Sequence, residues 1–250
     1  MRILLLANNW VGLQIAKYLK ERNEQIVGLG IHAPDRQKYT TDIIKAVSLP
    51  NHLVFEGNVV NEPKTIEKIK EMKPDITLAA FWYYILGKEL LHLPRYGCIN
   101  FHPGFLPYNR GMNPNVWPFI EDSPAGVTLH YMTEEVDKGD IIAQKQIPIE
   151  ADDTAGSLEK KTWIEIVALF KKTWPKLKKQ QVKSIPQDDA KATVHTAKDI
   201  FTVDEIYLNK NYTGKELINR LRARSYPKHF FAYYKVNGEK VFIKVVLTSE

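Results

Sequence analysis

Apolar, strand-like runs alternate with helical segments through the first hundred residues of the chain. Helical segments near 42–47 and 62–72 lie between runs at residues 1–7, 25–31, 52–55, 75–80 and 97–102. Parallel neighbours in a sheet need long crossover connections of this kind, usually helices. The pattern therefore predicts an α/β fold with a doubly wound, mostly parallel, Rossmann-like sheet.

The turn after the first run argues against a dinucleotide cofactor. Such a turn needs Gly-x-Gly-x-x-Gly, and only Gly12 is present here. We expect Asn9 to act as an ordinary N-cap of the helix that follows.

Two polar residues close the fifth apolar run. Asn100 and His102 are two positions apart, and side chains in a strand alternate between faces, so both project the same way. Pro103 cannot donate to a ladder, so the strand should end at His102. Ligands of open α/β sheets bind outside the carboxyl ends of the strands. The alternative, two polar core residues satisfied by nearby backbone, is the commoner fate of either residue alone.

Three blocks that follow one another resemble the formyltransferases that use N10-formyltetrahydrofolate. The family patterns are Asn-x-His-Pro-x-x-Leu-Pro, Gly-Val-Thr-x-His and Asp-x-Gly, which fall here at 100–107, 126–130 and 137–139. The resemblance covers about residues 1–180. It implies a formyltransferase fold, formyl transfer as the activity, the folate as formyl donor without a metal, and a catalytic triad of Asn100, His102 and Asp137.

The chemistry of formyl transfer suits these three residue types. The amide of Asn100 can donate to an oxyanion, and such a donor is worth about 10²–10³ in rate. His102 can accept a proton from the attacking amine and return it near neutral pH. Asp137 can orient the imidazole and raise its proton affinity, although Asp beside Lys-Gly is also ordinary turn chemistry. Asp140 fits that turn role better than Asp137 does.

An aromatic segment follows the fourth run and should reach the same edge of the sheet. A flat pterin suits apolar walls with a few polar groups, and the corresponding family loop holds the folate. We expect folate contacts from Phe81, Tyr83, Leu86 and Val136. The segment can also pack on the sheet as an ordinary hydrophobic loop, and such packing is compatible with folate contacts.

The segment 110–118 and the end of the chain resemble bacterial sugar N-formyltransferases, which act on nucleotide-linked amino-dideoxy sugars for surface polysaccharides such as O-antigen. The resemblance favours dTDP-4-amino-4,6-dideoxyglucose or a close relative as acceptor. Arg222 and Arg224 have forked side chains that can bind a diphosphate. An equally good interpretation is that they are a cation pair that stabilises the dipole at a helix end. The candidate substrate-binding residues are Arg110, Asn113, Asn115, Trp117, His130, Arg222, Arg224 and Tyr226.

Three other functions remain open. Methionyl-tRNA formyltransferases share the triad, but in that family a larger C-terminal barrel follows the catalytic domain. The last 55 or so residues here, with one expected hairpin, are short for such a barrel. Glycinamide ribonucleotide formyltransferases also share the triad, but they carry a glycine-rich loop after the first strand. The third is a non-catalytic folate or nucleotide-sugar binding protein. The presence of all three triad residues argues against it, because binding alone needs no aligned proton donor and oxyanion donor.

We predict two domains, a catalytic one over 1–185 and a small C-terminal α+β subdomain over 186–250, with a linker at about 184–199. Asn237-Gly238 between two β-like runs is a strong hairpin signal. The formal charge is +6, and we assign its excess to the solvated face of one long helix, with no nucleic acid as partner.

We expect a cytoplasmic protein that neither spans nor binds a membrane. The sequence has no run of 18 uncharged apolar residues, no charged-then-apolar leader, and the single cysteine Cys98. Cys98 lies in an apolar run, so we expect a buried, inert thiol. A homodimer formed through the C-terminal hairpin is implied by the family resemblance alone.

Overall fold

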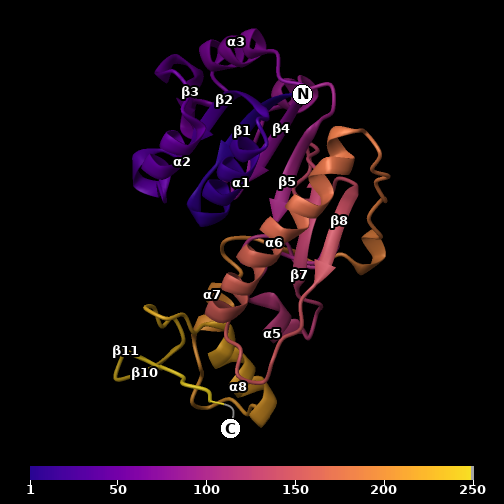
Figure 1. Cartoon of the computed structure of the whole chain (residues 1–250). Coiled ribbons are helices and arrows are strands. Elements are labelled where there is room, and N and C mark those ends of the chain that lie inside the picture. Colours follow the sequence, from indigo (N-terminus) through magenta and orange to yellow (C-terminus); the bar gives the residue numbers. More distant parts are fainter. Residues whose placement is uncertain (249–250) are drawn as a thin grey trace. The chain divides into compact units, whose positions relative to one another are not determined.

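The computed structural model describes residues 1–248, which divide by their internal contacts into two compact units (Figure 1). The first unit comprises Met1–His102, Thr128–Gln144 and Trp163–Gln187. The second comprises Pro103–Val127, Lys145–Thr162 and the chain from Asp188 onward. These units are defined by contacts rather than by independent folding, so the domain boundary near residue 185 stays a prediction.

A seven-stranded sheet has the order β3-β2-β1-β4-β5-β7-β8. The first five strands along the chain pair in parallel, whereas β7 pairs antiparallel with β5. This confirms the predicted mostly parallel α/β fold. The strand bounds are β1 Arg2–Ala7, β2 Gln25–Ile31, β3 Val54–Glu56, β4 Ile76–Ala80, β5 Cys98–His102, β7 Gly126–Tyr131 and β8 Ile141–Gln146.

Helices make the crossovers between the parallel strands, as the alternation of the sequence predicts. The run expected at 52–55 starts late, because a 3-10 turn, η2 Asn51–Leu53, precedes β3. The helices of this part are α1 Asn9–Glu21, α2 Thr40–Val47, α3 Pro63–Met72 and α4 Lys88–His92, with short turns η1 Pro34–Arg36 and η3 Gly57–Val59.

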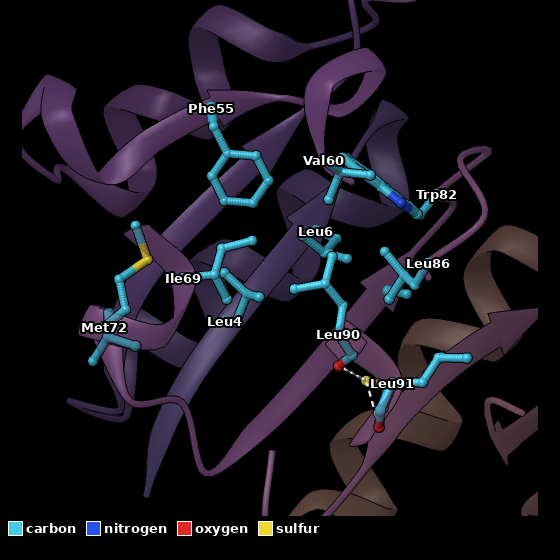
Figure 2. Packing of buried hydrophobic residues seen from close by; sticks show 13 residues of the cluster. Leu4, Leu6, Phe55, Val60, Ile69, Met72, Trp82, Leu86, Leu90 and Leu91 are labelled. Atoms are coloured by element: carbon cyan, nitrogen blue, oxygen red, sulfur yellow. Dashed lines mark hydrogen bonds between the residues drawn. The ribbon is translucent and has the colours of Figure 1, made fainter. Parts of the chain in front are cut away.

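An apolar core lies in the first unit and includes part of the aromatic segment. Figure 2 shows Leu4 and Leu6 of β1 gathered with Ile69 and Met72 of α3 in one cluster. Trp82 belongs to the same cluster. Burying each such side chain stabilises the fold by about 1.5–3 kcal/mol before entropy is counted.

Cys98 lies in this core, as expected. Its Sγ is 3.6 Å from the Leu90 carbonyl oxygen and 3.7 Å from that of Leu91. Burial raises the pKa of the Cys98 thiol to about 11. The thiol is therefore protonated at neutral pH and is a poor nucleophile.

The long helix α6, Ala155–Lys178, carries an apolar stripe and a basic face. Trp174 is fully buried and donates to the Glu24 carboxylate at 3.0 Å, to which Lys178 is also paired. Apart from Lys161, which is half-buried, the basic residues assigned to the solvated face are exposed: Lys160, Lys171, Lys172, Lys176, Lys178, Lys179 and Lys183. In the described chain, no helix is both long and apolar enough to cross a bilayer.

The second unit contains short elements and one hairpin. Asn237 and Gly238 both have positive φ, at 50° and 86°, which is the backbone that a two-residue hairpin turn requires. The predicted hairpin is thus confirmed. The elements are β6 Arg110–Gly111, α5 Trp117–Glu121, η4 Asp189–Lys191, β9 Val194–His195, α7 Phe201–Asp204, α8 Gly214–Ala223, β10 Tyr233–Val236 and β11 Glu239–Phe242.

Two glycines of the first unit make room for the aromatic segment. A Cβ on Gly57 would lie 2.3 Å from the Tyr84 ring and 2.6 Å from the Trp82 ring. A Cβ on Gly30 would lie 3.0 Å from Trp82. The segment therefore fits against the chain only where side chains are absent.

We predict that Gly57→Ala lowers the free energy of unfolding by about 1–3 kcal/mol, because the new methyl group overpacks two rings. Urea unfolding followed by tryptophan fluorescence would measure the loss. Gly214→Ala is the matched control, since a Cβ there meets nothing within 4 Å. Equal stability of the two variants would contradict the packing argument.

Candidate functional site

Asn100 and His102 sit at the end of β5 in the first unit. The register of the antiparallel pair places His130 of β7 opposite Asn100 and Thr128 opposite His102. Directly opposed side chains share a face of the sheet, so these four side chains lie on one face. His102 and His130 are 3% and 1% exposed.

Asp137 brings a carboxylate to this group from the turn between β7 and β8. One oxygen, Oδ1, accepts from Asn100 Nδ2 at 3.2 Å and is 3.3 Å from His130 Nε2. The other, Oδ2, is 3.3 Å from His102 Nδ1. Asn100 and His102 therefore both contact the Asp137 carboxylate, in a cluster whose two imidazoles are buried while Asn100 and Asp137 are half-buried.

The turn that carries Asp137 is held by specific contacts. Asp137 has a positive φ of 54°. Gln187 Nε2 donates to the carbonyl oxygens of both Asp137 and Gly139 at 2.7 Å. A Cβ on Gly139 would lie 1.8 Å from the Tyr131 carbonyl oxygen, so only glycine fits there. Asp140 accepts instead from Ser184 at 3.1 Å.

The hydrogen bonds assign the tautomer of His130. Its Nδ1 is 2.8 Å from the Tyr131 carbonyl oxygen, which can only accept, so Nδ1 carries the proton. Nε2 of the neutral ring then accepts from Asn100 Nδ2 at 3.2 Å. The two amide hydrogens of Asn100 are thus divided between His130 and Asp137.

The orientation of His102 follows from Asp137. A carboxylate facing Nδ1 favours the tautomer with the proton on that nitrogen. Nε2 then carries the lone pair that a general base needs. The same carboxylate stabilises the imidazolium once the ring has taken up a proton.

The expected folate contacts lie in two segments of the first unit. Phe81 and Leu86 are only 8% and 4% exposed, whereas Tyr83 and Val136 are each 58% exposed. Ile85 is not among the residues expected to contact folate, but it precedes Leu86 in the chain and is 73% exposed. Apolar and aromatic side chains with a few polar groups are the common lining of a ligand pocket. The role of each residue toward folate stays a prediction.

Three candidate substrate residues of the second unit are tied into one local structure. Arg110 is 2% exposed and pairs with Asp189 at 2.7 Å. Trp117 stacks on His195 with centroids 3.8 Å apart, and its Nε1 donates to the Met112 carbonyl oxygen. Asn113, between them, has a positive φ of 58°.

The other four candidates of the second unit are engaged at the C-terminal part of the chain. Asn115 donates to the Tyr226 hydroxyl at 3.1 Å, and burial raises the pKa of Tyr226. Arg222 donates to the backbone carbonyls of Asp153 and Glu150. Arg224 is 6% exposed and pairs with Asp204. These contacts give both arginines a structural partner, and a role toward a diphosphate stays a prediction.

A second polar cluster in the first unit carries no sequence motif. His32, just after β2, has no exposed surface, and its Nδ1 is 3.0 Å from Asn8 Nδ2. Burial, together with the charge of Arg36, lowers the pKa of His32 from 6.5 to about 4. Asn8 is the N-cap residue of α1, while Asn9, the expected cap, has φ of 56° and accepts from Val11 N.

Comparison with known proteins places both parts of the chain. Residues 20–171 match the formyl transferase family, and residues 199–249 match the N-formyltransferase dimerization C-terminal domain. The methionyl-tRNA formyltransferase of Bacillus subtilis (strain 168) is 31% identical over 250 residues, which is 97% of this chain and 77% of that protein.

Solved structures of similar proteins match along the whole chain. The Mycobacterium tuberculosis protein Rv3404c, a candidate sugar N-formyltransferase, has a TM-score of 0.82 at 25% identity, with 100% of this chain and 98% of that chain covered. A 4-N formyltransferase from Francisella tularensis has a TM-score of 0.85 at 24% identity, with the same coverage.

We predict that stability falls on acidification through His32. The unfolded chain takes up this proton near pH 6.5 and the folded protein only near pH 4. The contribution of neutral His32 to the free energy of unfolding is therefore fully present above pH 6.5 and is lost as the pH falls toward 4. We expect this loss to be on the order of 1–3 kcal/mol.

Urea unfolding at several pH values between 7.5 and 4.5 would measure this loss in wild type and in His32→Phe, which has no such proton to take up. The wild-type curve should fall more steeply. Parallel curves for the two proteins would show that His32 does not contribute.

Proposed function

Because the chain belongs to the formyltransferase family, we propose that it transfers a formyl group from N10-formyltetrahydrofolate to the amino group of a nucleotide-linked amino-dideoxy sugar. The observation that carries the chemistry is the cluster in which Asn100, His102 and His130 contact the Asp137 carboxylate. Binding alone needs no proton acceptor aligned in this way.

The reaction needs a neutral amine, a stabilised oxyanion and a proton for the leaving nitrogen. The amine nitrogen bonds to the formyl carbon while His102 Nε2 takes the amine proton. The resulting imidazolium is stabilised by Asp137 at Nδ1. The C–N10 bond then breaks, and the same proton passes from His102 to N10, so that tetrahydrofolate and the formamide leave.

Asn100 would donate to the oxygen of the tetrahedral intermediate. Both of its amide hydrogens are engaged here, by His130 Nε2 and Asp137 Oδ1, each at 3.2 Å. Donation to the oxyanion therefore requires one of these contacts to be exchanged.

The acceptor is inferred from the second half of the chain. The segment around Arg110, Asn113 and Trp117 resembles that of sugar N-formyltransferases, and the match of residues 199–249 to an N-formyltransferase C-terminal domain points the same way. We favour dTDP-4-amino-4,6-dideoxyglucose or a close relative, with the product used for surface polysaccharide. The formyl group would come from the folate bound against Phe81, Tyr83, Leu86 and Val136.

A second candidate acceptor is charged initiator tRNA. It is favoured by the 31% identity to a methionyl-tRNA formyltransferase and by the formal charge of +6. The two acceptors differ in charge, and hence in salt dependence: tRNA binding should weaken steeply with salt through counterion release, whereas a diphosphate should respond much less.

We also propose a homodimer through the C-terminal hairpin. Residues 199–249 match a domain described as a dimerization domain. In the hairpin, Val236, Val241 and Phe242 are 45%, 39% and 57% exposed. Covering these apolar side chains with a second copy would remove them from water.

A panel of acceptors tests the proposed function. We expect a mass increase of one formyl group on a dTDP-linked 4-amino sugar, and none on 3-amino sugars, UDP- or GDP-linked sugars or glycinamide ribonucleotide. Formylation of charged initiator tRNA alone would favour the second candidate. Folate binding without formylation of any acceptor would contradict both.

We predict that Asn100→Ala lowers kcat by about 10²–10³-fold and His102→Ala by about 10²–10⁴-fold, with folate affinity almost unchanged. Asn58→Ala and His92→Ala, at exposed positions of the same unit, are the matched controls. Loss of folate binding with normal turnover would reverse the roles assigned here.

A further inference from the structure

The aromatic segment Phe81–Leu86 is organised around His32. The His32 ring centroid lies 5.3 Å from that of Trp82, 5.2 Å from Tyr83 and 5.1 Å from Tyr84. Two of these contacts are edge-to-face, at 71° and 79°, an arrangement that aromatic pairs prefer. One buried ring thus touches three consecutive residues of the segment.

Asn8 fixes the tautomer of this ring. Asn8 Oδ1 accepts from Lys38 N at 3.0 Å, and Nδ2 faces the Arg36 carbonyl oxygen at 3.3 Å, so the amide orientation is determined. Nδ2 therefore donates to His32 Nδ1. The proton of the neutral ring must then be on Nε2.

Phe81 makes an edge-to-face contact with Trp163, and hydrogen bonds hold the second half of the segment. Ala33 N donates to the Tyr84 hydroxyl at 3.1 Å. Asn61 donates to the Ile85 carbonyl oxygen and accepts from Gly87 N, both at 2.8 Å. The ring of His32 is the contact shared by residues 82 and 83, and residue 83 is one of the exposed side chains expected to face the folate.

We propose that His32 is a positioning residue whose neutral ring, protonated on Nε2 and held by Asn8, keeps residues 81–86 in the conformation that binds the formyl-folate. The proposal rests on the proposed function in naming folate as the ligand. His32 would act through the aromatic segment and not on the reacting atoms.

The surroundings of His32 make this role dependent on pH. The groups that face it are Arg36 and Asp35 from η1 and the phenols of Tyr83 and Tyr84 from the aromatic segment. Burial and Arg36 oppose a charge on the ring, while Asp35 and the Arg36 and Phe81 backbones favour one. The ring is therefore neutral at physiological pH, and acidification should loosen the segment.

The first experiment measures binding of 5-formyltetrahydrofolate, a stable folate probe, by calorimetry. We expect His32→Phe, which keeps a ring but cannot accept from Asn8, to raise the folate Kd about tenfold while kcat at saturating folate changes less than twofold. His52→Phe, at an exposed position of the same unit, is the matched control. Hydrogen exchange should show faster exchange over residues 81–87 in His32→Phe only.

A second variant provides a readout that packing alone would not change. Asn8→Asp places a carboxylate at His32 Nδ1, which favours the protonated ring. The pH at which folate affinity is lost should therefore rise toward neutrality relative to wild type. Near-UV circular dichroism at pH 8 would establish that both variants are folded.

The outcomes separate this proposal from the proposed function. A wild-type protein that binds no folate would overturn both. Equal folate affinity and equal exchange over 81–87 in folded His32→Phe and wild type, or an unchanged pH midpoint in folded Asn8→Asp, would overturn the positioning role alone.

Discussion

The carboxylate of Asp137 is the group on which the site depends. Its two oxygens divide between Asn100 and His130 on one side and His102 on the other. A carboxylate that is largely withdrawn from water is tolerated only when its hydrogen bonds are satisfied, and here Asn100 donates to one oxygen while His102 Nδ1 faces the other. Removing the charge would leave the Asn100 amide and the His102 imidazole without their common partner. The turn geometry imposed by Gly139 and Gln187 serves to hold this one group in place.

The predictable parts of the site are those that depend on local spacing. Asn100 and His102 share a face because strands have a period of two, and this required no tertiary information. Asp137 is identified by resemblance, since it lies 35 positions after His102 in the chain. The part played by His130 depends on the register of β5 against β7 and on the Tyr131 carbonyl. Neither can be read from composition or periodicity.

The same distinction holds for the rest of the fold. The parallel strands were predicted because each is an apolar run bounded by a helix, and the hairpin because Asn-Gly favours positive φ. The partners of Arg222 could not be predicted, because the carbonyls it binds lie 69 and 72 positions away. His32 is a single histidine after a strand, and nothing in its sequence neighbourhood predicts the three rings that pack on it.

The antiparallel pairing of β5 with β7 also bears on which parts of the site must stay fixed and which can vary in length. The 23 residues from Pro103 to Ala125 lie between these two strands in the chain. A one-residue slip of β7 would turn His130 to the opposite face, so register is under strict constraint. The length of the intervening segment is not constrained in that way, because a loop that keeps its end points can grow at small entropic cost. Relatives can therefore differ in the length of this segment while the cluster of Asn100, His102, His130 and Asp137 keeps its register.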